Sequence, residues 1–170
     1  MGNEVDFGHL VKIEDIEAYA DAGDAPLLRE MLDEAKKYLT SHEWCLEIGE
    51  SYLGLGLGKV LALFLFRMVR AVDGQDEWLW VVVGDVPSAY FVTDSAPDPA
   101  SALEVYCNLM EDWARAVQEG KDLSKCFPVR KDPTEEQAKM LFNRTKFIRE
   151  QFVPIALQPP MEHWDKSGQQ

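Results

Sequence analysis

A glycine-rich run from Gly54 to Lys59 is the first stretch of this sequence that could carry chemistry. Its glycines would let backbone N–H groups surround a phosphate, and the lysine would add positive charge. A phosphate loop of the Walker type also requires a glycine at position 53 and a serine or threonine at position 60, where this chain has Leu53 and Val60. We therefore interpret the run as a turn or bulge between two strands.

The candidates for a metal site and for a nucleophile are incomplete. His42 and Cys45 form an H-x-x-C pair, but a closed structural zinc site takes four ligands. The other histidines and cysteines are scattered along the chain, at His9, Cys107, Cys126 and His163. The sequence also lacks a G-x-S-x-G motif, and no histidine is an obvious base for a serine or cysteine nucleophile. The sequence therefore predicts no catalytic residue, no metal and no cofactor.

Carboxylates and aromatic residues are the remaining groups with functional potential. Neighbouring acids such as Glu111 and Asp112 arise by chance in so acidic a chain, and acid–base catalysis needs one carboxyl group to be desolvated. Aromatic rings beside carboxylates are typical of hot spots for a basic protein partner, although the same rings also suit a core beneath helices. The candidate partner-binding residues are Glu14, Asp15, Glu17, Asp21, Asp24, Trp78, Tyr90, Asp94 and Asp98.

The charge of the chain is strongly negative and unevenly distributed. Asp and Glu number 30 against 17 Lys and Arg, a net charge of −13, and residues 1–50 contribute 13 acids and 4 bases, a net of −9. Such a field repels nucleic acids and anionic membranes, and it steers basic proteins toward the acidic region. We expect the N-terminal third to dominate this steering. The alternative interpretation is that its acidic residues only form a solvated helix surface.

Length and composition predict one soluble domain spanning residues 1–170. A chain of 170 residues with 46% hydrophobic content can bury a sizeable core. Three widely spaced cysteines suggest no disulfide framework, which fits a reducing cytoplasm. The longest apolar run, residues 60–66, is too short to cross a bilayer, and the first residues lack the apolar segment of a signal peptide. We expect a loose tail after about residue 157.

Apolar spacing and turn residues predict an α+β fold, in which a four-stranded antiparallel sheet has helices at its N- and C-terminal ends. Helical spacing begins near Ile13 and continues in a second helix from Asp24 to Leu39. The expected strands are residues 44–52, 60–70, 78–83 and 89–93, which short links make antiparallel neighbours. A helix capped by Asp98 and ended by Gly120 places Trp113 on a buried stripe, and a last helix begins near Asp132 and stops at Pro154.

Several of these motifs together resemble a family of small, uncharacterised bacterial proteins. They are Trp80–Tyr90, Thr93–Asp94, Ala102–Tyr106, Met110–Trp113, Phe127–Val129 and Pro133–Glu135. The motifs consist of turn residues, caps and helix stripes, so this resemblance implies no particular activity.

In general character the chain is also similar to toxin-neutralising immunity proteins, which are small, acidic and cytoplasmic and have no catalytic motif. That resemblance implies binding and inhibition of a basic bacterial toxin domain, with the acids pairing the toxin's Arg and Lys. Two other hypotheses stay open. One is a structural or adaptor subunit that acts through an apolar dimerisation or docking surface, and the other is an enzyme with an unrecognised site.

Overall fold

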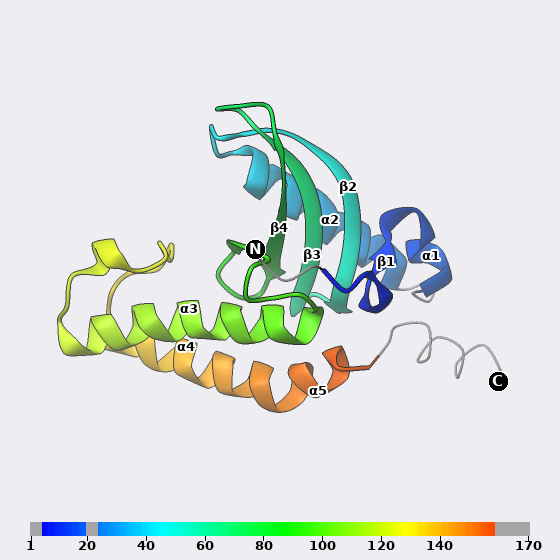
Figure 1. Ribbon diagram of the computed structural model, residues 1–170. Coiled ribbons are helices and arrows are strands. Elements are labelled where there is room, and N and C mark those ends of the chain that lie inside the picture. Colours follow the sequence, from blue (N-terminus) through cyan, green and yellow to red (C-terminus); the bar gives the residue numbers. More distant parts are fainter. Residues whose placement is uncertain (1–4, 20–23, 159–170) are drawn as a thin grey trace.

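An open antiparallel sheet lies at the centre of the computed structural model, which describes residues 5–19 and 24–158 (Figure 1). Its strand order follows the sequence, β1-β2-β3-β4-β5. The strands are β1 (Val11–Lys12), β2 (Cys45–Leu57), β3 (Leu61–Arg70), β4 (Asp76–Gly84) and β5 (Ala89–Val92). The predicted α+β class and antiparallel pairing are confirmed. The predicted number of strands is wrong by one, because β1 has two residues and is too short to produce an alternating pattern.

Strands β3 and β4 are buried on both faces. Every residue from Leu61 to Phe66 is buried, as is every residue from Leu79 to Val83. Side chains alternate between the two faces of a strand, so a run buried at every position requires cover on both sides of the sheet. The central position predicted for residues 60–70 is confirmed, and this double burial dictates where the helices lie.

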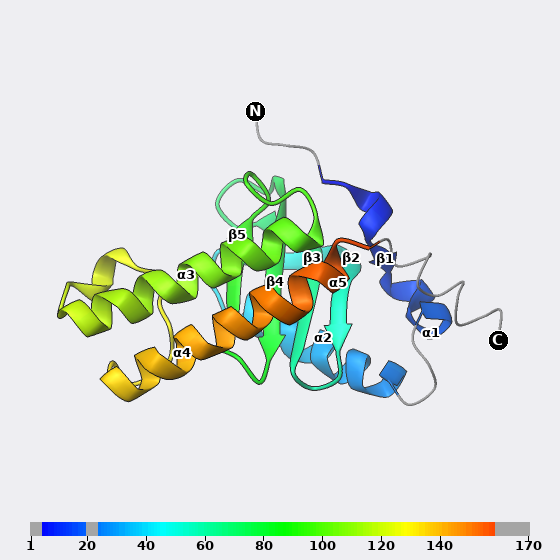
Figure 2. The same cartoon turned by 90° about the horizontal axis from the view of Figure 1, so that it is seen from below.

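Helices from the two ends of the chain cover opposite faces of the sheet (Figures 1 and 2). On one face, α2 (Asp24–Thr40) packs its apolar stripe, including Leu28 and Leu32, against Phe64 and Phe66 of β3. On the other face, α3 (Pro99–Glu119) packs against β3 and β4. Figure 1 shows α3 between the sheet and α4 (Glu135–Phe147), so α4 forms an outer layer.

Short elements complete the chain around these layers. At the N-terminal end they are η1 (Phe7–His9), η2 (Ile13–Asp15) and α1 (Ile16–Tyr19). Between α3 and α4 lies η3 (Leu123–Lys125), and after α4 come the π-helix η4 (Ile148–Phe152) and α5 (Val153–Ala156). The first predicted helix therefore corresponds to a 3₁₀ turn followed by a single helical turn.

The ends of α3 follow the predicted signals, whereas the end of the last helical segment does not. The Asp98 carboxylate accepts a hydrogen bond from the backbone N–H of Ser101 at 2.8 Å, and Gly120 ends α3 in the left-handed conformation with φ 66°.

The prediction that Pro154 stops the last helix is wrong. Pro154 lies in the first turn of α5, where its missing N–H would have no partner within the helix, so the chain remains helical through Ala156.

The glycine-rich run is largely part of β2 and turns only at its end. The pairing of β2 with β3 shifts register between Leu53 and Leu55, so the predicted bulge is present, and Gly58 has a positive φ of 56° in the turn. A Cβ on Gly56 would lie 2.3 Å from a methyl group of Leu28. Gly56 therefore allows α2 to approach the sheet closely, which is a packing role rather than a phosphate-binding one.

The predicted burial of Trp113 is confirmed, because its exposed fraction is 2% within the core beneath α3. We expect Trp113→Ala to lower the free energy of unfolding by about 3 to 5 kcal/mol, because it leaves a cavity in a packed core. Gln118→Ala, at an exposed position of the same helix, is the control and should change it by less than about 0.5 kcal/mol. Urea denaturation measures both, and an unchanged midpoint for Trp113→Ala would contradict the assignment.

Candidate partner-binding surface

An acidic surface lies on the N-terminal elements, and we name it the acidic face. It consists of Glu14, Asp15, Glu17, Glu30, Asp33 and Glu34, which come from η2, α1 and α2 and are all exposed. The two parts of this surface are joined at Glu17, whose carboxylate accepts a hydrogen bond from Nε of Arg29 at 2.6 Å. That hydrogen bond is the main reason why the pKa of Glu17 lies below its usual range.

The other five carboxylates of the acidic face make no ion pair within residues 5–19 and 24–158. On α2, Glu30, Asp33 and Glu34 follow one another at the spacing of one exposed helix stripe. These side chains are hydrated and unneutralised, so their field extends into solvent.

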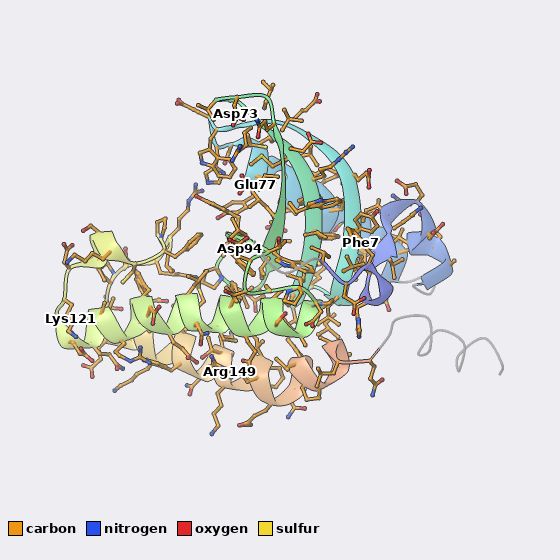
Figure 3. The ribbon with its side chains drawn as sticks, viewed as in Figure 1. Phe7, Asp73, Glu77, Asp94, Lys121 and Arg149 are labelled. Atoms are coloured by element: carbon orange, nitrogen blue, oxygen red, sulfur yellow. The ribbon has the colours of Figure 1, made fainter. Side chains whose placement is uncertain are left out.

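The remaining acidic candidates differ in how far they are available. Asp24 is exposed at the first position of α2, and Asp94 is exposed in the loop after β5, near α3 (Figure 3). Asp98 is occupied as the cap of α3. Asp21 falls outside the described residues. Asp24 thus lies on the same helix as Glu30, Asp33 and Glu34 of the acidic face. Asp94 and Asp98 lie instead in the segment that leads into α3.

The two aromatic candidates do not form one patch, because they point to opposite faces of the sheet. Val81 is the partner of Tyr90 across β4 and β5, so Tyr90 lies on the α2 face. Trp78 lies on the α3 face, where its ring contacts Phe7 at 5.4 Å and Tyr52 at 5.9 Å between centroids. Figure 3 shows Phe7 beside this part of the sheet, above the start of α3. Trp78 is therefore half covered by the N-terminal segment.

Tyr90 belongs to a group of five half-buried rings at the β5 edge, which we name the edge cluster: Tyr38, His42, Trp44, Tyr90 and Phe127. The His42 ring lies 4.8 Å from Trp44 and 4.9 Å from Tyr90 between centroids, and Phe127 lies 5.4 Å from Tyr90. Burial raises the pKa of Tyr38 to about 12. Sequence reasoning missed this cluster because its rings come from three separated segments, residues 38–44, β5 and the loop after η3, which only the folded chain brings together.

The edge cluster also accounts for His42, which the sequence raised as half of a metal site. Its Nδ1 lies 3.1 Å from the carbonyl oxygen of Leu39, so the ring is fixed against the end of α2. Cys45, its H-x-x-C partner, is buried in the core beneath α2. Among the described residues, no group of three or more His, Cys, Asp or Glu side chains could hold a metal ion.

A polar group centred on Arg149 joins α3 to α4 and η4 (Figure 3). Arg149 donates from Nε to Glu104 at 2.7 Å, from Nη2 to Asn108 at 2.7 Å, and from Nη1 to Glu111. Thr145 donates to the same Glu111 oxygen at 2.6 Å. Arg149 lies on the π-helix η4, a local geometry often found at functional sites. Here each of the three guanidinium nitrogens donates a hydrogen bond to α3, so the network serves as a clamp.

The neighbouring groups that could act chemically are engaged or buried. Glu111 is bound by Arg149 and Thr145 while Asp112 is exposed, so the two acids do not face a common space as a catalytic pair would. Burial raises the pKa of the Cys107 thiol to about 12, so this cysteine is a thiol rather than a nucleophilic thiolate near neutral pH. Across the described ranges, none of the helices is both long and apolar enough to cross a membrane.

Comparisons of this chain with protein-family models, with curated proteins and with solved structures find no match. The function is therefore inferred from this chain's own residues.

The Arg149 clamp gives a direct test of how α3 holds the outer layer. We expect Arg149→Met to lower the free energy of unfolding by about 1 to 3 kcal/mol, because Glu111 would remain largely buried without its charged partner. Lys146→Met is the matched control, because Lys146 is exposed and forms a surface ion pair with Glu150 at 4.0 Å. This change should alter the free energy of unfolding by less than about 0.5 kcal/mol. Equal urea midpoints for the two variants would show that the network contributes nothing to stability.

Proposed function

We propose that this protein is a non-catalytic binding protein whose acidic face docks on a basic protein. The observation that carries the proposal is a set of exposed carboxylates on η2 and α2 that make no ion pair in the described part of the chain: Glu14, Asp15, Glu30, Asp33 and Glu34. In its most specific form the partner is a bacterial toxin domain and the protein is its immunity protein. Carboxylates would then cover the arginines and lysines with which such a domain holds phosphates.

Several carboxylates elsewhere in the fold differ from those of the acidic face, because they form ion pairs with arginines. Arg67 binds Glu50 and Asp76, and Arg70 binds Asp73 and Glu77 near the β3–β4 hairpin. Figure 3 shows Asp73 and Glu77 at this end of the sheet. Glu104 and Glu111 are bound by Arg149. Glu14, Asp15, Glu30, Asp33 and Glu34 make no ion pair with another described residue, so a partner could bind them without breaking one.

Kinetic measurements on charge-reversed variants test this proposal. The partner is first captured from the native host on immobilised parent protein and purified. Glu14, Asp15, Glu30 and Glu34 are then changed to Lys, which shifts the net charge from −13 to −5, because four reversals add eight charges. We expect association to slow tenfold or more at low salt, since steering depends on local charge, and the difference should shrink at high salt.

The matched control reverses four exposed acids on the other layer and at its ends: Asp112, Asp132, Glu136 and Glu150. It reaches the same net charge but leaves the acidic face intact, so it should associate nearly as fast as the parent. Equal slowing in both variants would assign the effect to total charge. An unchanged rate in the first variant, or a captured partner that is not basic, would contradict the proposal.

A second candidate function, a subunit that dimerises or docks through an apolar surface, is favoured by one observation. The outer layer exposes Met140 and Phe147 on α4 and Ile155 on α5. Met140 and Phe147 are seven residues apart and so share one helix face. Light scattering coupled to size exclusion distinguishes this function. A dimer that persists at 1 M salt and is lost in Phe147→Ser supports dimerisation through this surface, and a monomer at every concentration contradicts dimerisation.

A further inference from the structure

A small cavity of about 200 Å³ lies between the β4–β5 turn and α4, remote from the acidic face. The turn contributes Gly84, Asp85, Val86 and Pro87. From the other side the wall is formed by Lys131, Gln137, Met140, Leu141 and Arg144. The Gly-Asp-Val-Pro sequence of this turn is part of the motif block noted in the sequence, and the proposed docking function does not use it.

The β4–β5 turn is held in place from two directions, so this wall of the cavity is already formed before a ligand binds. Gly84 has φ 132°, and a Cβ at this position would lie 2.5 Å from the carbonyl oxygen of Val60. The N–H of Asp85 donates to the same oxygen at 3.0 Å. From the opposite side, the hydroxyl group of the buried Tyr106 donates to the carbonyl oxygen of Pro87 at 2.7 Å. Rigid walls reduce the ordering cost of binding a ligand.

Positive groups predominate in the lining of this cavity, although the chain as a whole carries a net charge of −13. Arg144 contacts Asp85 through Nη2 at 2.9 Å, which is its only ion pair in the described part of the chain. Lys131 makes no ion pair there. Gln137 adds an amide group, and Asp85 is the one acid in the lining. The lining therefore holds two cations and one carboxylate, and the carboxylate is paired with Arg144.

We propose that this cavity binds a small anion bearing a carboxylate or phosphate group. Arginine presents several N–H donors in a plane that matches the oxygens of such groups, and lysine adds a second charge. The volume is below the roughly 300 to 1,000 Å³ of pockets for drug-sized ligands but holds several waters of about 30 Å³ each. A compact anion therefore fits, with Leu141 and Met140 beside its apolar part. This site is independent of the proposed docking function.

Nuclear magnetic resonance titrations with inorganic phosphate and with acetate, at constant ionic strength set by chloride, test the proposal. We expect saturable shifts of the backbone amides of Asp85, Val86 and Gln137. Arg144→Gln and Lys131→Gln should each weaken binding by about tenfold or more, as expected for the loss of a charge-assisted hydrogen bond. The stronger of the two probes identifies whether phosphate or carboxylate is the preferred group.

Lys139→Gln is the matched control, because Lys139 lies on α4 outside the cavity and pairs only at the surface with Glu135 at 3.8 Å. It should bind like the parent. Lys131→Gln breaks no ion pair, so its effect does not depend on a change in folding. Linear shifts without saturation for both probes would overturn the proposal, as would equal affinities in the parent, Arg144→Gln and Lys131→Gln.

Discussion

Burial of β3 and β4 on both faces is the constraint on which the rest of this structure depends. Leu61–Phe66 and Leu79–Val83 leave no solvent-facing side of the central strands, so each face must be covered by a helix. The helix from the N-terminal end covers one face and α3 from the C-terminal half covers the other. Each covering helix buries its apolar stripe and turns its charged residues outward, which is how the acids of α2 come to face solvent.

The two sides of the sheet differ in what lies beyond the first helix. Beyond α2 there is the acidic face, whose parts on α1 and α2 are joined by the hydrogen bond between Glu17 and Arg29. Beyond α3 there is a second helical layer, which the Arg149 clamp and apolar packing attach to α3. The two proposed binding sites follow this division, because the acidic face lies on the α2 side and the cationic cavity borders α4. The two proposed sites thus lie on different layers of one fold.

Much of the fold could be predicted from the sequence because its main elements carry strong local signals. The continuous apolar run of β3 indicated a central strand, and Asp98, Pro99 and Gly120 marked the ends of α3. The signals failed where local rules are ambiguous. β1 is too short to show a period, and Pro154 is compatible with the first turn of a new helix as well as with the end of an old one.

The candidate sites were less predictable, because they depend on contacts between distant segments. The sequence shows that Glu14 and Glu111 are acidic and it marks Asp98 as a helix cap. It does not show that Arg149 clamps Glu111, or that Glu14 makes no ion pair with another described residue. Likewise, the edge cluster unites His42, Tyr90 and Phe127 only after the chain has folded. Residue type indicated the chemistry, and topology determined which residues are available.

Zero-length carbodiimide cross-linking of the complex with its captured partner tests the central claim most directly. This reagent joins carboxylates to lysines that touch them, so the cross-linked residues report the docking face. The account predicts cross-links from Glu14, Asp15, Glu30, Asp33 or Glu34 to lysines of the partner. Cross-links confined to Glu136 and Glu150, beside the exposed apolar residues of the outer layer, would contradict it.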